Sequence, residues 1–468
     1  MSTVKESLDP LLKVYSDAEC LRITSNIPIA DLIVKDIFTQ SEQIAQSVIQ
    51  QEYSRQKSLD NKIDKIVTSR IFGYPLMLIL LGIVFWITIA GANVPSKMIA
   101  TVLLGFQDVL TQWFQVIHAP VWLHGILVLG MYRTLAWVVS VMLPPMAIFF
   151  PLFTLLEDLG YLPRVAFNLD HLFKKAKACG KQSLTMCMGF GCNAAGVVSA
   201  RIIDSPRERL IAILTNNFVP CNGRFPTLIA IASIFMAGAL ALSQKSLVAA
   251  ATITILVLLG IAATFVVSKI LSETVLKGEL SSLVLELPPY RKPKFGAVLY
   301  RSIIDRTIFV LRRAIVVAAP AGAITWILAN IYIGDISVIG FVVGILDPIA
   351  KAIGLDGFIL MAFILGLPAN EIVIPLLLMS YLATGQLTEF ASLQGLKDVL
   401  IANGWTWLTA INTMLFALLH WPCATTLLSM YKETGSKKWT IIGFIIPTVI
   451  AFTVCFITAQ AAYLLGLA

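Results

Sequence analysis

The sequence predicts an all-α protein that crosses a membrane several times. Hydrophobic residues make up 57% of its 468 residues and charged residues only 13%, whereas a soluble domain has about 25% charged residues. Apolar runs of roughly 20 residues, long enough to cross a hydrocarbon core about 30 Å thick, recur along the chain. The formal net charge of +8 fits basic cytoplasmic loops and requires no nucleic acid partner.

Residues 1–70 are predicted to form a short helical segment in the cytoplasm. They carry no signal peptide, and the stretch from Ala30 to Arg70 contains no Gly or Pro. Apolar residues such as Ile33, Ile37 and Ile44 recur near helical spacing. The segment is too short to be a catalytic domain of ordinary size.

Nine apolar segments follow, and the Lys and Arg residues between them predict the topology. Connections rich in these residues are expected inside, namely 157–181, 201–209, 271–313 and 431–438. The poorly basic connections are expected outside, namely 91–121, 334–356 and 384–404. Seven segments are then full spans, with the N-terminus in the cytoplasm and the C-terminus outside. These are 71–90, 122–156, 209–239, 247–270, 308–333, 405–430 and 439–463.

The other two segments, 182–200 and 357–383, have both flanks on one side, so each is predicted to be a re-entrant hairpin. Both contain helix breakers, and irregular backbone survives at membrane depth only where protein or a polar cavity satisfies it. The motif "GFGCN" (189–193) in the first hairpin aligns with "GLPAN" (366–370) in the second. Each hairpin is followed by a Pro-Cys pair inside a long apolar segment, Pro220-Cys221 and Pro422-Cys423.

These matches predict an inverted repeat, which is a common plan for a transporter whose site lies between the two halves. The first membrane half is 71–270, with its hairpin region at 182–239. The second half is 308–468, with its hairpin region at 357–430. A basic linker over 271–313 joins the halves in the cytoplasm.

Three of the seven cysteines are candidates for an ion path. Cys192, Cys221 and Cys423 each lie beside a predicted helix break, and all seven cysteines are expected to be free thiols. Pro220 and Pro422 lack an amide donor, so the carbonyls of residues 216 and 418 are expected to be free. Thiols beside free carbonyls favour a borderline or soft transition ion. The alternative is that the cysteines only pack as small apolar residues.

Several polar residues are expected near these thiols. Asn193, Asn370, Glu371 and His420 are the candidate neighbours, whereas the other amides are expected to make interhelical hydrogen bonds. Arg224 and Glu371 lie well inside apolar segments, where a charge costs at least about 2.5 kcal/mol. We therefore expect them to form a structural ion pair, with Glu371 also acting as a cation ligand.

The soluble segment contains Asn61-Lys62-Ile63-Asp64, which matches the NKxD pattern that reads guanine in small GTPases. The chain has no G-x-x-x-x-G-K-[ST] loop, since its one Gly-Lys pair, Gly180-Lys181, is followed by Gln182. The motif also falls on a predicted helix. The sequence therefore predicts that this chain is not an enzyme and binds no GTP or other cofactor.

Longer stretches of sequence resemble the membrane part of the bacterial ferrous-iron transport protein B (FeoB) family. They are "LDNKIDKIVTSRIFGYPLMLIL", "LLEDLGYLPRVAFNLDHLFKKAKACGKQ", "GFGCN", "PCNGRFPTL", "LELPPYRKPKF" and "HWPCATTLLSMYKETGSKKWT". The resemblance implies a Gate-type transporter fold, multi-pass in the cytoplasmic membrane, that takes up Fe2+ as its substrate. It also implies that Cys192, Cys221 and Cys423 line the pore.

Two departures from the family pattern are visible. Family members usually begin with a GTPase domain, so either a separate GTPase-domain protein, expected to dock on residues 1–70 and the 271–313 linker, supplies it or the protein works without one. A small Feo-type accessory protein is a further expected partner. The second hairpin, "GLPANEIVIP", lacks the lysine that is frequent in the family. Two alternatives stay open: a Gate-fold permease for a nucleoside or other solute, and a non-transporting regulatory paralogue. Metal selectivity, energy source and homo-oligomer formation are open as well.

Overall fold

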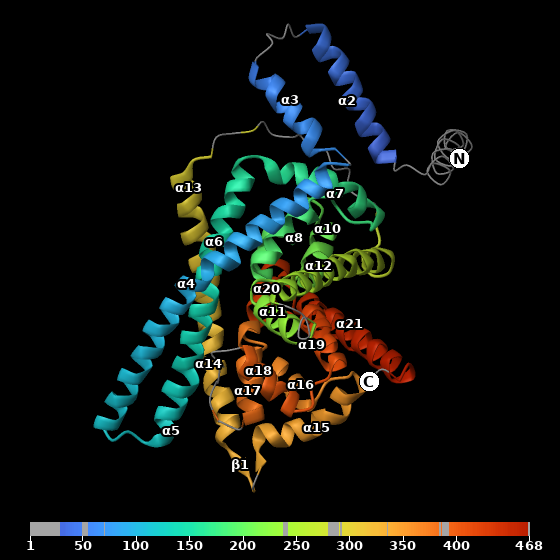
Figure 1. Ribbon diagram of the computed structural model, residues 1–468. Coiled ribbons are helices and arrows are strands. Elements are labelled where there is room, and N and C mark those ends of the chain that lie inside the picture. The colour runs from blue at the N-terminus through green and yellow to red at the C-terminus, as the bar shows by residue number, and fades with distance from the viewer. Residues whose placement is uncertain are drawn as a thin grey trace, which may run out of the picture.

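The computed structural model describes residues 29–48, 55–69, 71–236, 242–278, 290, 293–334, 336–382, 385 and 393–466. Over these residues the chain is a bundle of helices with one short β-hairpin, β1 (Tyr332–Ile333) and β2 (Ile336–Ser337). The N-terminal helices lie at one end of the molecule and the β-hairpin at the other (Figure 1). The predicted all-α class is confirmed.

The helices of the first half are α2 (Ile29–Val48), α3 (Arg55–Val67), α4 (Gly73–Val116), α5 (Val121–His124), α6 (Arg133–Asp158), α7 (Tyr161–Lys175), α8 (Gln182–Gly191), α9 (Asn193–Ser199), α10 (Pro206–Thr215), α11 (Phe225–Ile231) and α12 (Leu242–Glu273). Those of the second half are α13 (Phe295–Tyr300), α14 (Phe309–Asn330), α15 (Val338–Ala352), α16 (Gly357–Leu365), α17 (Val373–Leu382), α18 (Leu393–Ala402), α19 (Trp407–Leu419), α20 (Ala424–Thr434) and α21 (Lys437–Leu464). Short 3-10 or π segments adjoin them: η1 (Gly125–Tyr132), η2 (Ala200–Ile202), η3 (Asn216–Phe218), η4 (Ala232–Met236), η5 (Arg301–Ile308) and η6 (Asn370–Ile372).

Several of these helices are suited to a membrane. Within the described ranges, five helical stretches are long and apolar enough to cross one, and a sixth is added if α15 and α16, bent by 110°, count as one span. The five stretches are Val121–Asp158, Val248–Glu273, Val310–Asn330, Trp407–Thr434 and Lys437–Leu464. The predicted number of seven spans, the re-entry of the hairpins and their sidedness stay predictions.

The connection expected over 91–121 is mostly helical. Helix α4 runs without interruption for 44 residues, with Pro95 inside it, and at 1.5 Å per residue it is about 66 Å long. It packs along α6, and the two helices form a long arm that reaches away from the rest of the bundle (Figure 1). Neither Gly91 nor Pro95 ends the helix.

Both predicted hairpins break at aligned residues. In the first hairpin Cys192 is extended, with φ −158° and ψ 125°, and α9 begins at the next residue. In the second hairpin Ala369 is extended, with φ −153° and ψ 118°, and η6 begins at the next residue. The aligned residues of "GFGCN" and "GLPAN" therefore share one backbone conformation, which supports the repeat inferred from sequence.

One apolar core joins the two halves. Leu214, Phe218 and Leu228 of the first half are fully buried in the same cluster as Leu376 and Phe416 of the second. Burial of this apolar surface stabilises the fold by about 25 cal/mol per Å². The core holds the broken segments of the two halves against each other, and this contact positions the site described below.

A polar clasp ties the N-terminal segment to the bundle. The guanidinium of Arg164 on α7 is 1% exposed and forms a bidentate pair with Asp64 of α3, with Nε–Oδ1 at 3.0 Å and Nη2–Oδ2 at 3.1 Å. The Tyr290 hydroxyl donates to the same carboxylate at 2.8 Å, and the guanidinium lies 4.3 Å from the centre of the Tyr290 ring. Burial alone would raise the pKa of Asp64, but the hydrogen bonds from Arg164 and Tyr290 hold that pKa below its ordinary value. Asp64, the last residue of the NKxD match, thus has a structural role.

We expect Asp64→Asn to lower the free energy of unfolding by about 3 kcal/mol, because it removes the carboxylate that pairs with the buried Arg164 cation. Thermal unfolding of the purified protein in detergent measures the loss. A carboxyl with a lowered pKa stabilises the fold above its unfolded pKa, near 3.9, and that contribution disappears as the pH falls through its folded pKa. The difference between wild type and variant should therefore be constant near neutral pH, begin to fall near pH 4 and vanish only below the folded pKa of Asp64.

Asp204→Asn is the matched control for this prediction. Asp204 also pairs with a basic side chain, Lys181, but it is 88% exposed, and exposed pairs contribute little to stability. This variant should unfold at the wild-type temperature. Equal losses in the two variants would contradict the special role of the clasp.

Candidate functional site

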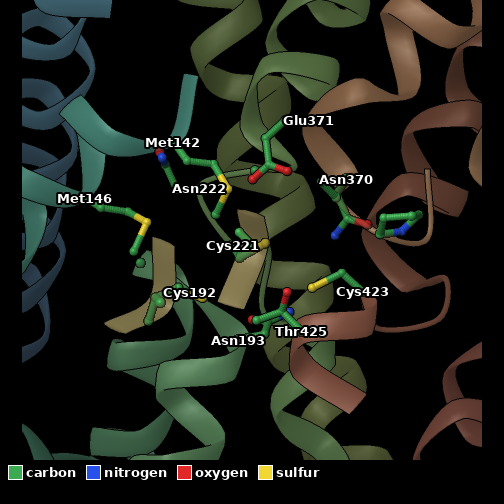
Figure 2. A pocket seen from close by; sticks show the side chains of 16 residues that line it. Met142, Met146, Cys192, Asn193, Cys221, Asn222, Asn370, Glu371, Cys423 and Thr425 are labelled. Atoms are coloured by element: carbon green, nitrogen blue, oxygen red, sulfur yellow. The ribbon is translucent and has the colours of Figure 1, made fainter. Parts of the chain in front are cut away.

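A small cavity of about 30 Å³ lies where the broken segments of the two halves meet. Hairpin residues Cys192, Asn193, Asn370 and Glu371 line it, together with Cys221 and Cys423 from the two Pro-Cys breaks (Figure 2). Six of the seven residues predicted for the ion path are thus brought together. The other lining residues are Met142, Met146, Gly191, Asn222, Gly223, Val310, Ala314, Pro368, Ala369 and Thr425.

The three cavity cysteines are free thiols. Cys192 and Cys221 are buried, and the Cys423 sulfur lies 3.2 Å from the Thr426 hydroxyl. Among the residues that the structure describes, no three His, Cys, Asp or Glu side chains lie close enough together to hold a metal ion. The three thiols therefore line a common cavity, but they do not form a complete set of metal ligands.

Asn370 lines the cavity and carries a side-chain acceptor without a partner. Its side chain is 5% exposed, and its Oδ1 atom has no hydrogen-bond partner in the protein. A buried polar group without a partner costs about 1–3 kcal/mol. The cavity beside this amide is large enough for a water molecule or a dehydrated ion. The Asn370 amide is thus the strongest local indication of a ligand.

Glu371 lies against backbone that only glycine permits. A Cβ atom built on Gly223 would lie 2.2 Å from Oε1 of Glu371, closer than atoms approach without a shift. The glycine that follows the first Pro-Cys break therefore makes room for the carboxylate of the second hairpin. In this way one half of the molecule positions the one acidic side chain that lines the cavity.

The predicted ion pair between Arg224 and Glu371 is wrong. The Arg224 guanidinium, which is 1% exposed, instead donates to oxygens of residues that precede the two Pro-Cys pairs in sequence. The acceptors are the carbonyls of Asn217 (2.8 Å), Leu418 (2.8 Å), His420 (3.2 Å) and Trp421 (3.3 Å) and the side-chain oxygen of Asn217 (3.0 Å). The carbonyls of Leu418, His420 and Trp421 lie at the C-terminal end of α19, and the C-terminus of a helix attracts a cation.

The two carbonyls that were expected to be free, those of residues 216 and 418, both accept hydrogen bonds. Pro422 removes the amide that would bond to the Leu418 carbonyl, and the Arg224 guanidinium takes its place at 2.8 Å. The Asn216 carbonyl, opened by Pro220, accepts the amide N–H of Val219 at 3.3 Å. Neither carbonyl is left to bind an ion. The predicted site of thiols beside free carbonyls is therefore not formed with these two oxygens.

His420 does not line the cavity. It is buried at the end of α19, its Nδ1 lies 3.0 Å from the carbonyls of Phe416 and Ala417, and its ring packs on Phe363 and Phe416. Its spacing of three residues from Cys423 suggested a ligand, but the break at Pro422 turns the two side chains to different surroundings. The structure gives His420 a packing role.

The amides outside the cavity hold helices together, as expected. Asn217 donates to the His420 carbonyl at 2.7 Å, Asn216 to the Asn193 carbonyl at 3.0 Å, and Asn412 to the Ile353 carbonyl at 2.9 Å. The Asn193 amide, which lines the cavity, donates to the carbonyls of Gly189 and Val219 at 3.0 and 3.1 Å in the orientation that satisfies both of its polar atoms. Asn193 therefore also fixes the first hairpin to the first break.

The lining residues that sequence reasoning missed include Met142 and Met146 of α6. They look like ordinary apolar residues of a membrane helix, and the one available signal was their spacing of four, which places them on one helix face. The methionines of the first hairpin, Met186 and Met188, are instead buried in the apolar cluster around that hairpin.

We expect Arg224→Gln to destabilise the protein by about 3 kcal/mol or more, because several buried carbonyls at the α19 break lose their donor at once. Arg224→Lys should lose less, since it keeps a cation beside the helix end. Thermal unfolding in detergent and the yield of monodisperse protein measure both effects. Lys177→Gln, in which a half-exposed lysine loses its pairing with the half-exposed Glu273, is the control and should behave as wild type. An Arg224→Gln protein with the wild-type unfolding temperature would contradict the assignment.

Two protein families match the chain. The Gate family, described as nucleoside recognition, matches residues 139–235 and 311–437. The family described as ferrous iron transport protein B C terminus matches residues 253–305. The Gate ranges contain both hairpins and both Pro-Cys breaks, and therefore most residues of the cavity. No solved structure matches the chain significantly.

Similar proteins carry the same family name. The Fe(2+) transporter FeoB of Staphylococcus aureus is 28% identical over 90% of this chain and 62% of its own length. The Fe(2+) transporter FeoB of Synechocystis is 27% identical over 100% of this chain and 72% of its own length. A protein of Porphyromonas gingivalis named as a fusion of Fe(2+) transport protein A and FeoB is 25% identical over 86% of this chain and 52% of its own length. The chain thus spans 62% of the length of the first of these relatives, and over most of its own length it is similar to the membrane part of the FeoB family.

Proposed function

We propose that this chain forms the path by which ferrous iron enters the cell across the cytoplasmic membrane. The observation that carries the proposal is the cavity between the two repeats, where three thiols, a carboxylate and the unpartnered Asn370 oxygen converge. The proteins it resembles are named Fe(2+) transporters. In this proposal the N-terminus is cytoplasmic and the two hairpins enter from opposite faces.

The chemistry of the cavity suits a borderline divalent ion in transit. Thiol sulfurs accept soft and borderline ions, whereas amide and carboxylate oxygens accept harder ones, and Fe2+ binds both kinds of ligand. The cavity has space for about one water molecule, so a hydrated ion has to exchange water for protein ligands there. Because the thiols do not form a closed set, the ion is held weakly and can leave again, as conduction requires.

Serine substitution at the three cavity cysteines tests this proposal. We expect Cys192→Ser, Cys221→Ser and Cys423→Ser each to lower Fe2+ flux into proteoliposomes by about tenfold, because serine keeps the size but loses the soft sulfur ligand. Expression and unfolding temperature should stay nearly unchanged. Hg2+ or a small methanethiosulfonate should block the wild type, and Fe2+ should protect it.

The control for this experiment is Cys455→Ser. Cys455 is buried on α21, away from the cavity, and should tolerate the change, as should Cys20, which lies outside the described residues. If the triple serine variant carries Fe2+ at the wild-type rate, the cysteines are packing residues. Uptake of a labelled nucleoside in place of Fe2+ would favour the alternative permease, and no flux of either would favour a regulatory role.

A partner on the N-terminal helices is a second part of the proposal. Helix α2 exposes large apolar side chains to solvent, among them Ile37 (56% exposed) and Ile44 (65%), and such a surface marks an interaction site. Because the family usually combines this membrane part with a GTPase domain, we propose that a separate GTPase-domain protein covers α2.

A pull-down with the full chain as bait measures this interaction. Wild type should recover a GTPase, and Ile37→Asp combined with Ile44→Asp should lose it, since a buried charge at the interface is costly. Ser41→Asp, also on the exposed surface of α2, is the control. Recovery of a small accessory protein alone, or equal recovery by all variants, would overturn the choice of partner.

A further inference from the structure

Two methionines bring thioether sulfur to the cavity from a third direction. Met142 and Met146 lie four residues apart on α6, a helix outside both hairpins and both Pro-Cys breaks. Figure 2 shows both side chains reaching from that helix toward the cysteines. Met146 is 2% exposed. The two sulfurs therefore line the wall that faces the thiols.

With these residues the cavity becomes rich in sulfur. Five sulfur-bearing side chains line it, three cysteines and two methionines, against one carboxylate, that of Glu371. Thiolate and thioether ligands select soft ions such as Cu(I), whereas carboxylate and carbonyl ligands suit harder ions. The donor set therefore favours a softer cation than Fe2+.

An unsatisfied polar group supports a ligand here independently of the sulfurs. Asn370 is 5% exposed, its Oδ1 has no partner, and it lines the same cavity. The oxygen is fixed by its position at the start of η6, directly after the extended Ala369. A cation bound among the sulfurs would lie in a cavity lined by an amide that the protein itself leaves partly unpaired.

We propose that Met142 and Met146 are thioether ligands of this cavity, and that the cavity binds a soft monovalent cation, Cu(I) or Ag(I), in competition with Fe2+. The competition rests on the proposed function, whereas the binding does not. The role separates these two methionines from others in the core, such as Met361 of α16 and Met414 of α19, which are equally buried but do not line the cavity.

Silver bound to selenomethionine-labelled protein tests the inference directly. One equivalent of Ag+ is added to the full chain in detergent, and silver-edge X-ray absorption then distinguishes selenium neighbours, which are former methionines, from cysteine sulfur. Wild type should show a silver–selenium neighbour. Met142→Leu combined with Met146→Leu should lose it and bind Ag+ about tenfold more weakly, and Met361→Leu combined with Met414→Leu should keep both properties.

Each outcome decides the matter. No selenium neighbour in wild type, or one that persists in the Met142→Leu, Met146→Leu protein, overturns the inference and leaves the methionines as packing residues. Met→Leu exchanges in a core usually cost less than about 1.5 kcal/mol, and the single variants replace the double one if it does not fold. In proteoliposomes, the Ag+ concentration that halves Fe2+ flux should rise about tenfold in the double variant. Silver–selenium contact without any Fe2+ flux would refute the proposed function and leave this inference standing.

Discussion

The hydrogen bonds of Arg224 are the interaction on which the arrangement of the two halves depends. Each half interrupts a long apolar segment at a Pro-Cys pair, and an interrupted helix end inside a membrane needs donors for its carbonyls. One guanidinium from the first half supplies them to the end of α19 in the second, at 2.8 to 3.3 Å. A helix end that has its donors can stay broken, and only a broken helix places Cys423 at the cavity. The buried Arg224 charge thus stabilises the broken helix end and does not form an ion pair with Glu371.

The class of the protein and the residues of the cavity could be predicted from the sequence because both have local signals. Apolar length and the Gly and Pro breaks predicted apolar helices that are interrupted, and the aligned "GFGCN" and "GLPAN" motifs predicted equivalent breaks, as the extended Cys192 and Ala369 confirm. Several side chains at these breaks line the space between the halves. This is why Cys192, Asn193, Cys221, Asn370, Glu371 and Cys423 meet.

What the sequence did not predict depends on where long side chains point. Arg224 and Glu371 both lie near the cavity, but only coordinates show that the arginine reaches the α19 carbonyls while the carboxylate rests on Gly223. His420 was judged by its spacing from Cys423, although a proline between them redirects the chain. Met142 and Met146 were missed because a methionine in an apolar helix carries no sign of which neighbour it faces.

The sequence separation of the Arg224 contacts bears on how the protein is made. Arg224 and the Leu418 carbonyl are 194 residues apart, and at about 5–20 residues per second the ribosome needs roughly 10–40 s to synthesise the intervening chain. For that interval the first half is in the membrane with a cation that lacks its later partners, and with Phe218 and Leu228 not yet covered by the second half. The newly made first half therefore needs a protected site, such as the insertion machinery itself, until the second half arrives.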